Sequence, residues 1–206
     1  MKYIDLSHEF REDMTLYPGS SKPIIEQVSN IETDGFNQLE LSFTNHIGTH
    51  LDVQAHVIKG GKKITDYDIS SFQGKGKIFD CRNVEEIGKD VFEDKLTDVD
   101  FVLIWTDYGK RFYNKDYMDN YPVLNKEGID YIISNNVKGV GIDYISVDPI
   151  NTSDMFVHKQ LLRNDVIIYE NLCNLHLLEN TEFKFMGFPI QISGDGIPVR
   201  AVAEIK

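Results

Sequence analysis

The densest group of chemically active side chains lies in the stretch NHIGTHLDVQAH, residues 45–56. It holds three of the six histidines of the chain together with one aspartate: His46, His50, Asp52 and His56. Imidazole and carboxylate groups together are ligands for zinc, manganese or iron, and a catalytic site commonly takes about three protein ligands plus water. So many imidazoles in a chain otherwise poor in histidine favour a metal site over a set of unrelated surface or core histidines.

The spacing of these residues decides between a helix and a bent extended chain. On a helix, His46 and His50 would share a face, but Asp52 and His56 would point away from it. On a straight strand all four would point to one side, yet ten residues would span about 33 Å, which is too far for one site. Gly48 makes a bend easy at this point. We therefore expect a strand that runs into a tight turn, with His46, His50 and Asp52 converging.

A second pair of candidate ligands lies in FVHKQLLRNDVIIYENL, where His158 stands twelve residues before Glu170. Glu170 ends the apolar run VIIYE, where a buried carboxylate would be costly without a cation. Alone, such a pair is more often structural. Together with the first cluster, the two residues become further candidate ligands. Five ligands exceed what one zinc ion takes, and they suit two metal ions that share a bridging carboxylate.

The elements that must position these residues predict a mixed α/β fold. Strand patterns occur at 38–43, 76–81, 101–106, 137–143, 165–172, 188–192 and 199–205. The first alternates apolar and polar residues like a half-buried strand, and 101–106 is apolar enough for a central strand buried on both faces. Helical patterns at 126–136 and 157–164 each precede a strand. We expect one domain over 1–206, with a central mixed sheet that carries the site.

Composition limits the function classes. With 206 residues, 41% of them hydrophobic and 26% charged, the chain fits a soluble globular protein. A net charge of −12 gives little reason to expect a nucleic-acid partner. No stretch approaches the roughly 20 apolar residues that cross a bilayer, and MKYIDLSHEF is neither a signal peptide nor an anchor. Because Cys81 and Cys173 are interpreted as buried free thiols, a cytoplasmic location is expected.

The histidine-rich stretch resembles a known signature. HIGTHLDVQAH is similar to the H-x-G-T-H-x-D-x-P-x-H motif of the cyclase family of metal-dependent hydrolases, which includes bacterial kynurenine formamidases and isatin hydrolases. Other segments resemble the family in the same order: IDLSHEF, MTLYPG, GVGIDYISVDP, the spacing from His158 to Glu170, and GDGIPVRAVAEI. The similarity covers most of the chain. It implies a mixed β/β/α fold of the swivelling type and a homo-oligomer, either a dimer or a tetramer.

The resemblance also implies roles for individual residues. The metal ligands of the family fall on His46, His50, Asp52, His158 and Glu170. Its proton-shuttling histidine falls on His56, and the tryptophan that its formamidases place against the substrate ring falls on Tyr17. Tyr17 is therefore one departure from the pattern. The other is Gln54, which stands where the motif has proline.

The expected reaction is hydrolysis of a small amide by metal-bound hydroxide. The favoured substrate is an aryl formamide such as N-formylkynurenine, from tryptophan catabolism, with zinc as the expected metal (one or two ions) and manganese as the alternative. A pKa of about 6.5 suits His56 to take a proton from water and return it to the leaving nitrogen. Three alternatives stay open: hydrolysis of a cyclic amide such as isatin, a lyase or dehydratase reaction on a small acid, and metal binding without turnover.

Overall fold

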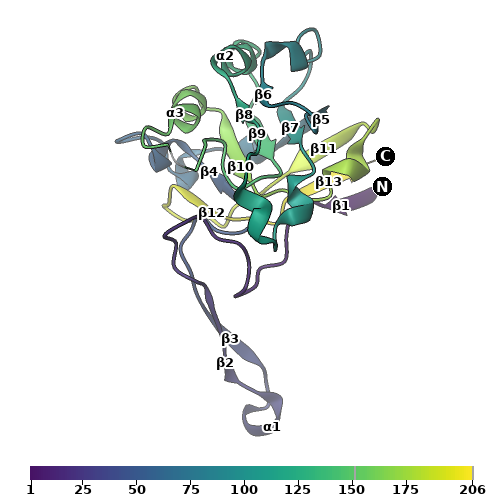
Figure 1. Cartoon of the computed structure of the whole chain (residues 1–206). Coiled ribbons are helices and arrows are strands. Elements are labelled where there is room, and N and C mark those ends of the chain that lie inside the picture. Colours follow the sequence, from purple (N-terminus) through teal and green to yellow (C-terminus); the bar gives the residue numbers. More distant parts are fainter. Residues whose placement is uncertain (151, 206) are drawn as a thin grey trace.

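The central feature of the computed structural model, which describes residues 1–150 and 152–205, is a nine-stranded sheet with the order β1-β13-β11-β5-β7-β9-β10-β4-β12. The strands are β1 (Lys2–Asp5), β4 (His50–Asp52), β5 (Gln73–Asp80), β7 (Phe101–Trp105), β9 (Gly139–Ile142), β10 (Ile167–Glu170), β11 (Phe183–Met186), β12 (Gly196–Pro198) and β13 (Val202–Ile205). The four strands β5, β7, β9 and β10 are parallel, and the flanking pairs are antiparallel. The sheet is therefore mixed, as expected from the sequence (Figure 1).

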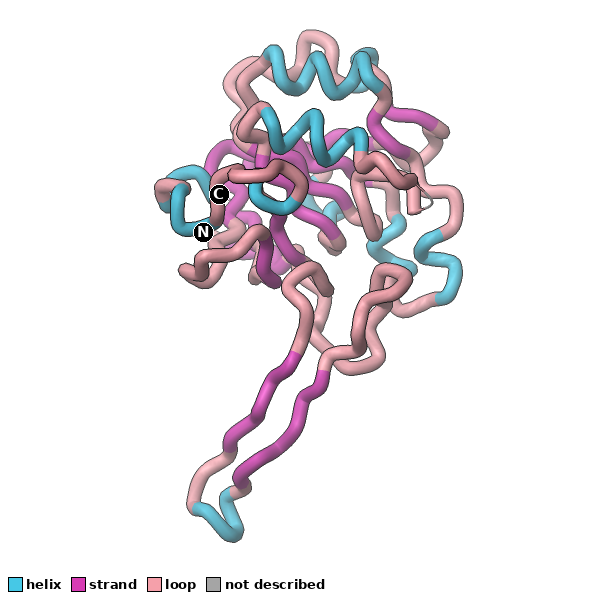
Figure 2. The backbone as a smooth tube through the Cα atoms, turned by 90° about the vertical axis from the view of Figure 1, so that its left-hand side faces the viewer, coloured by secondary structure: helices cyan, strands magenta, loops and turns pink. Residues whose placement is uncertain are grey.

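The sheet separates two hydrophobic cores. Val102 and Ile104 of β7 point into one core, which α2 (Lys126–Ser134) and α3 (Phe156–Arg163) cover. Leu103 and Trp105 of the same strand point into the other core. Because successive side chains alternate between faces, a strand between two cores must be apolar throughout. The prediction of a central, doubly buried strand at 101–106 is confirmed. Figures 1 and 2 show both helices on the same side of the sheet.

The second core is enclosed because the sheet curls. After β1 the chain continues towards the opposite end of the sheet, where Ser7 forms a bridge with Leu172, just beyond β10. The backbone N–H of Leu6 also donates to the carbonyl of Ala201 at 2.9 Å. The curl thus brings the N-terminal segment beside the end of β10, where Glu170 lies.

Shorter elements surround this body. A second small sheet pairs β6 (Glu86–Ile87) with β8 (Val123–Leu124). The 3-10 helices are η1 (Gln54–His56), η2 (Ile64–Asp66), η3 (Ile69–Phe72), η4 (Lys89–Val91), η5 (Tyr108–Arg111), η6 (Lys115–Met118) and η7 (Leu175–Leu178). None of the helices described here is long and apolar enough to cross a membrane.

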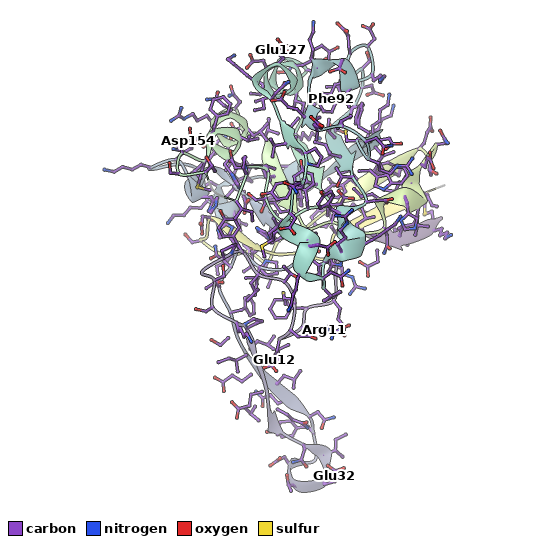
Figure 3. The ribbon with its side chains drawn as sticks, viewed as in Figure 1. Arg11, Glu12, Glu32, Phe92, Glu127 and Asp154 are labelled. Atoms are coloured by element: carbon purple, nitrogen blue, oxygen red, sulfur yellow. The ribbon has the colours of Figure 1, made fainter. Side chains whose placement is uncertain are left out.

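A hairpin arm, residues 24–42, projects from the body (Figures 1 and 2). It consists of β2 (Ile24–Ser29), the short helix α1 (Ile31–Asp34) and β3 (Gln38–Ser42), and Figure 3 shows Glu32 at its far end. A strand was expected at 38–43, but its predicted half-burial is wrong, since every residue of β3 is exposed. Apolar alternation indicates that a face is suited to burial, and here no other part of the described chain covers that face.

Most other predicted elements are confirmed, with bounds that differ by a few residues. The strands expected at 76–81, 137–143, 165–172 and 199–205 are β5, β9, β10 and β13, and the two predicted helices are α2 and α3. The strand expected at 188–192 is wrong: this segment is irregular, and Ile190 is 68% exposed. Pro189 lies inside it and has no N–H to donate to a neighbouring strand. The real strand there is β11, which ends before Gly187.

Candidate metal centre

Two neighbouring strands and one helix place the central side chains. β4 runs antiparallel to β10, and His50 lies directly opposite Glu170. Asp52 shares the face of His50 because side chains alternate along a strand. From α3, the Nε2 atom of His158 reaches to 3.4 Å from Glu170 Oε1 and 3.6 Å from Asp52 Oδ2. Three separate parts of the chain therefore meet at one point.

The bend before β4 adds His46 to this group. Gly48 has φ of +60°, in the left-handed region that favours glycine. The turn brings His46 Nδ1 to 2.6 Å from Asp52 Oδ1. The expected convergence of His46, His50 and Asp52 is thus observed, but the order of elements differs, because the turn precedes the strand and β4 begins at His50.

Hydrogen bonds on the outer side turn two of the histidines inward. His50 Nδ1 donates to the carbonyl of Gly48 at 2.9 Å, which leaves Nε2 facing Asp52 at 3.4 Å and Glu170 at 3.5 Å. His158 is held in the same way, with Nδ1 2.6 Å from the Asp148 carboxylate. In the neutral form of either ring, these contacts place the proton on Nδ1, so the lone pair of Nε2 points into the cluster.

The donor set fits a divalent metal. Asp52 is fully buried, and its Oδ2 atom has no hydrogen-bond partner among the described residues. Burial disfavours a protonated His158, yet Asp148, Asp52 and Glu170 outweigh this effect and raise the pKa of His158 well above its ordinary value. The cluster therefore attracts positive charge. Single ligand atoms of His50, Asp52 and Glu170 also lie within 4.8 Å of one another.

The cluster forms the floor of a cavity of about 330 Å³. Seven residues singled out from the sequence line it: Tyr17, His46, His50, Asp52, His56, His158 and Glu170. Leu16, Ile145 and Met155 add apolar walls. The hydroxyl of Tyr17 donates to the carbonyl of Ile150 at 2.9 Å, which ties its half-exposed ring to the wall. A small, partly apolar molecule could thus rest above the histidines and carboxylates.

His56 lies at the edge of the cluster, at the end of η1. Its ring centroid is 4.0 Å from that of His46, and burial lowers its pKa. Gln54, which begins η1, donates from Nε2 to Asp165 at 2.8 Å and accepts from the Lys62 N–H at 3.1 Å. These two hydrogen bonds hold the turn at the position where the sequence motif has proline.

Comparison with known proteins identifies the family. The model of the family named Cyclase matches residues 4–149. The chain belongs to the cyclase family. Kynurenine formamidases of Bacillus anthracis and of a Bacillus cereus strain are each 31% identical to it, over 98% of this chain and 96% of theirs. The cyclase-family chain is thus a hydrolase, and its cluster is suited to a divalent metal.

Solved structures share the fold. An isatin hydrolase bound to the product analogue thioisatinate superposes with a TM-score of 0.88 at 21% identity, over 100% of this chain and 93% of that one. A predicted metal-dependent hydrolase from Bacillus stearothermophilus gives a TM-score of 0.78 at 23% identity, over 98% and 97%. The expected mixed α/β fold is confirmed by these likenesses.

Sequence reasoning missed two carboxylates at this cyclase-family centre. Asp148 lies in the segment GVGIDYISVDP, and it accepts from the N–H groups of Val157 and His158 at 2.8 and 3.0 Å. It also orients the His158 ring. Asp195 lies in the segment GDGIPVRAVAEI, and its Oδ2 is 2.9 Å from His46 Nε2. Asp52 and Asp195 outweigh the effect of burial and raise the pKa of His46 to about 9.

Proposed function

We propose that this cyclase-family hydrolase cleaves a small aryl formamide, with N-formylkynurenine as the favoured substrate. The observation that carries the proposal is the cavity, whose floor is the buried cluster of histidines and carboxylates and whose rim holds His56 and Tyr17. The names of its Bacillus relatives, kynurenine formamidases 31% identical over nearly the whole chain, support the same substrate class.

Five residues are proposed as metal ligands: His46, His50, Asp52, His158 and Glu170. Zinc suits this mixture of imidazole and carboxylate donors, and manganese is the alternative. Asp52 lies between two halves of the cluster, with Oδ1 near His46 and His50 and Oδ2 near His158. This placement supports two ions that share the Asp52 carboxylate.

The protein's own residues are proposed to manage the proton. A bound divalent metal would lower the pKa of water and polarise the substrate carbonyl. His56 would accept a proton from the attacking water as the new C–O bond forms at the formyl carbon. It would then return that proton to the nitrogen as the C–N bond breaks, which releases formate and the free amine. Neutral His56 is the form that can act, and burial favours the neutral form.

Tyr17 is proposed to contact the aromatic ring of the substrate. Its hydrogen bond to Ile150 fixes the hydroxyl, so the face of its ring is available along the wall of the cavity. Aromatic pairs of this kind contribute about 0.5–1.5 kcal/mol beyond the area that they bury. Contact at this distance from the reacting carbonyl would affect binding more than the chemical step.

Hydrolysis of a cyclic amide is the second candidate. It is favoured by the likeness to isatin hydrolases, for which the TM-scores are 0.88 and 0.86. Both candidate reactions add water to an amide carbonyl, and they differ in whether the product stays in one piece.

The deciding test is turnover of N-formylkynurenine and of isatin by zinc-loaded protein, with His56→Ala assayed beside it. We expect formamide hydrolysis, and a loss of at least about 100-fold in kcat for the variant with its zinc content unchanged. Full turnover by His56→Ala would remove His56 from the reaction. Turnover of isatin alone would select the second candidate.

We further propose that the protein is a cytoplasmic homo-oligomer, either a dimer or a tetramer. The apolar face of the hairpin arm supports self-association, because no other part of the described chain covers it. The two cysteines, Cys81 and Cys173, are both free, which is the usual state in a reducing compartment.

A further inference from the structure

One carboxylate outside the proposed ligand set lies between two histidines that have different proposed roles. Asp195 Oδ2 is 2.9 Å from His46 Nε2 and 3.2 Å from His56 Nδ1. The other carboxylate oxygen, Oδ1, accepts from Asn45 Nδ2 at 2.7 Å. The backbone carbonyl of Asp195 also accepts from the Val53 N–H at 2.9 Å, which attaches this loop to the end of β4. Both carboxylate oxygens and the backbone of Asp195 are therefore held by hydrogen bonds.

The contact with His46 sets which ring nitrogen carries the proton. Nδ1 of His46 faces Asp52, at 2.6 Å, and Nε2 faces Asp195. An ionised carboxylate only accepts hydrogen bonds, so a neutral His46 can donate to one of these acids and not to both. A cation bound in the cluster would take the lone pair of Nδ1, and the remaining proton of His46 would then lie on Nε2, next to Asp195. Gly196 leaves room for the ring, because a Cβ there would lie 2.4 Å from His46 Cε1.

The contact with His56 has the same effect on a second ring. Nδ1 of His56 must donate to the Asp195 oxygen that also receives the His46 proton. The lone pair of His56 is then on Nε2. The proposed function needs a free ring nitrogen of this kind as proton acceptor.

We propose that Asp195 is a positioning residue that fixes the tautomers of His46 and His56 together. Through His46 it strengthens the hold on the metal, and through His56 it prepares the proton acceptor. The roles of these two histidines rest on the proposed function, but their tautomers do not depend on the identity of the substrate. Removal of an outer carboxylate of this kind typically lowers metal affinity by about 10- to 100-fold.

Asp148 provides a matched comparison. It is also an outer carboxylate of a proposed ligand, with Oδ2 2.6 Å from His158 Nδ1. Its hydrogen bonds go to the first turn of α3 and not to His56. Loss of Asp148 should therefore weaken metal binding without a change in the His56 tautomer.

The experiment compares Asp195→Asn and Asp148→Asn with the wild type. Asn45 Nδ2 donates to both Asp195 Oδ1 and the Gly196 carbonyl, so the oxygen of an asparagine at 195 is drawn to Asn45. The amide N–H groups of that asparagine then face the two histidines, which need a hydrogen-bond acceptor at this position. We expect zinc affinity, measured by chelator competition, to fall about 10- to 100-fold in both variants. In ¹H–¹⁵N NMR spectra of the zinc-loaded proteins, we expect His56 to change from the Nδ1–H to the Nε2–H tautomer in Asp195→Asn alone.

Wild-type zinc affinity in Asp195→Asn would overturn the inference, and so would a His56 tautomer that does not change in that variant. A change of the His56 tautomer in Asp148→Asn as well would indicate general loosening of the site, and would also overturn it. Asn45→Ala is a second variant, expected to shift both readouts in the same direction by freeing the Asp195 side chain. Because neither readout uses a substrate, inactivity towards N-formylkynurenine would count against the proposed function and not against Asp195.

Discussion

At the residue scale, Asp52 connects all parts of the centre. Its Oδ1 atom lies 2.6 Å from His46 Nδ1 and 3.4 Å from His50 Nε2, and its Oδ2 atom lies 3.6 Å from His158 Nε2. Although burial opposes ionisation, the surrounding histidines lower the pKa of Asp52 well below its ordinary value. A buried, ionised carboxylate with one unpaired oxygen has a strong need for a cation.

Asp52→Asn should therefore abolish stabilisation by zinc. A metal that binds only the folded state raises the melting temperature, by an amount that depends on its concentration relative to Kd. We expect the melting temperature of the wild type to rise by several degrees when zinc is added to the stripped protein, and that of the variant to stay constant within about 1 °C. Differential scanning calorimetry of both proteins provides the measurement. An equal rise in both would exclude Asp52 from the ligand set.

The residues of the centre differ in how far the sequence could identify them. The chain has only six histidines, so three within residues 45–56 stand out against the background. It has 33 aspartates and glutamates, and Asp148 and Asp195 therefore carry no comparable signal. Their importance comes from hydrogen bonds to histidines that are 10 and 149 positions away, and only the folded chain creates these contacts.

At the element scale, the parallel strands were predictable and the edges were not. β7 lies between two cores, so its composition alone indicates its place. The segments 183–186 and 188–192 both alternate, and a choice between them depends on whether a neighbouring strand is present to pair with. The strand β4 likewise depends on its neighbours, because its three residues form a strand only by pairing with β10 and β12. Long-range pairing, which the local sequence does not record, completes the site.

Asp143 joins the ends of two parallel strands, β7 and β9. It follows β9 and accepts from the N–H of Thr106, just after β7, at 3.0 and 3.1 Å. Burial raises its pKa to about 7 from the ordinary value of 3.8. Between these pH values the folded state holds a proton that the unfolded state has lost. This residue therefore makes stability fall as pH rises from about 4 to about 7, by up to about 1.4 kcal/mol per pH unit.

Asp143→Asn removes this titration and keeps the shape of the side chain. Urea unfolding at a series of pH values from 4.5 to 7.5 would give the free energy of unfolding of both proteins. We expect the stability of the wild type, relative to that of the variant, to decline steadily across this range. Parallel curves for the two proteins would mean that Asp143 is ionised in the folded state throughout.

At the scale of the whole molecule, the hairpin arm is the feature whose apolar face stays exposed in the described chain. Leu39 and Leu41 lie on one face of β3, opposite Gln27 and Ile25 of β2, and the two leucines are 56% and 53% exposed. An isolated two-stranded hairpin is marginally stable in water, so a projecting arm needs a surface to pack against. The segment from Thr15 to Tyr17 lines the cavity and leads into the arm, which connects any contact made by the arm to the cavity wall.

A second copy of the chain is the proposed partner of the arm, and substitution of its apolar face tests this. We expect the wild type to have a mass of two or four times 23.7 kDa in light scattering after size-exclusion chromatography. The double variant Leu39→Ser, Leu41→Ser should shift towards a single chain, because it removes the two leucines that the assembly would bury. Ile69→Ser is the matched control: Ile69 is 61% exposed on the body, and its loss should leave the mass unchanged. A wild-type protein that is monomeric at micromolar concentration would contradict the homo-oligomer, and an unchanged mass in the double variant would place the interface elsewhere.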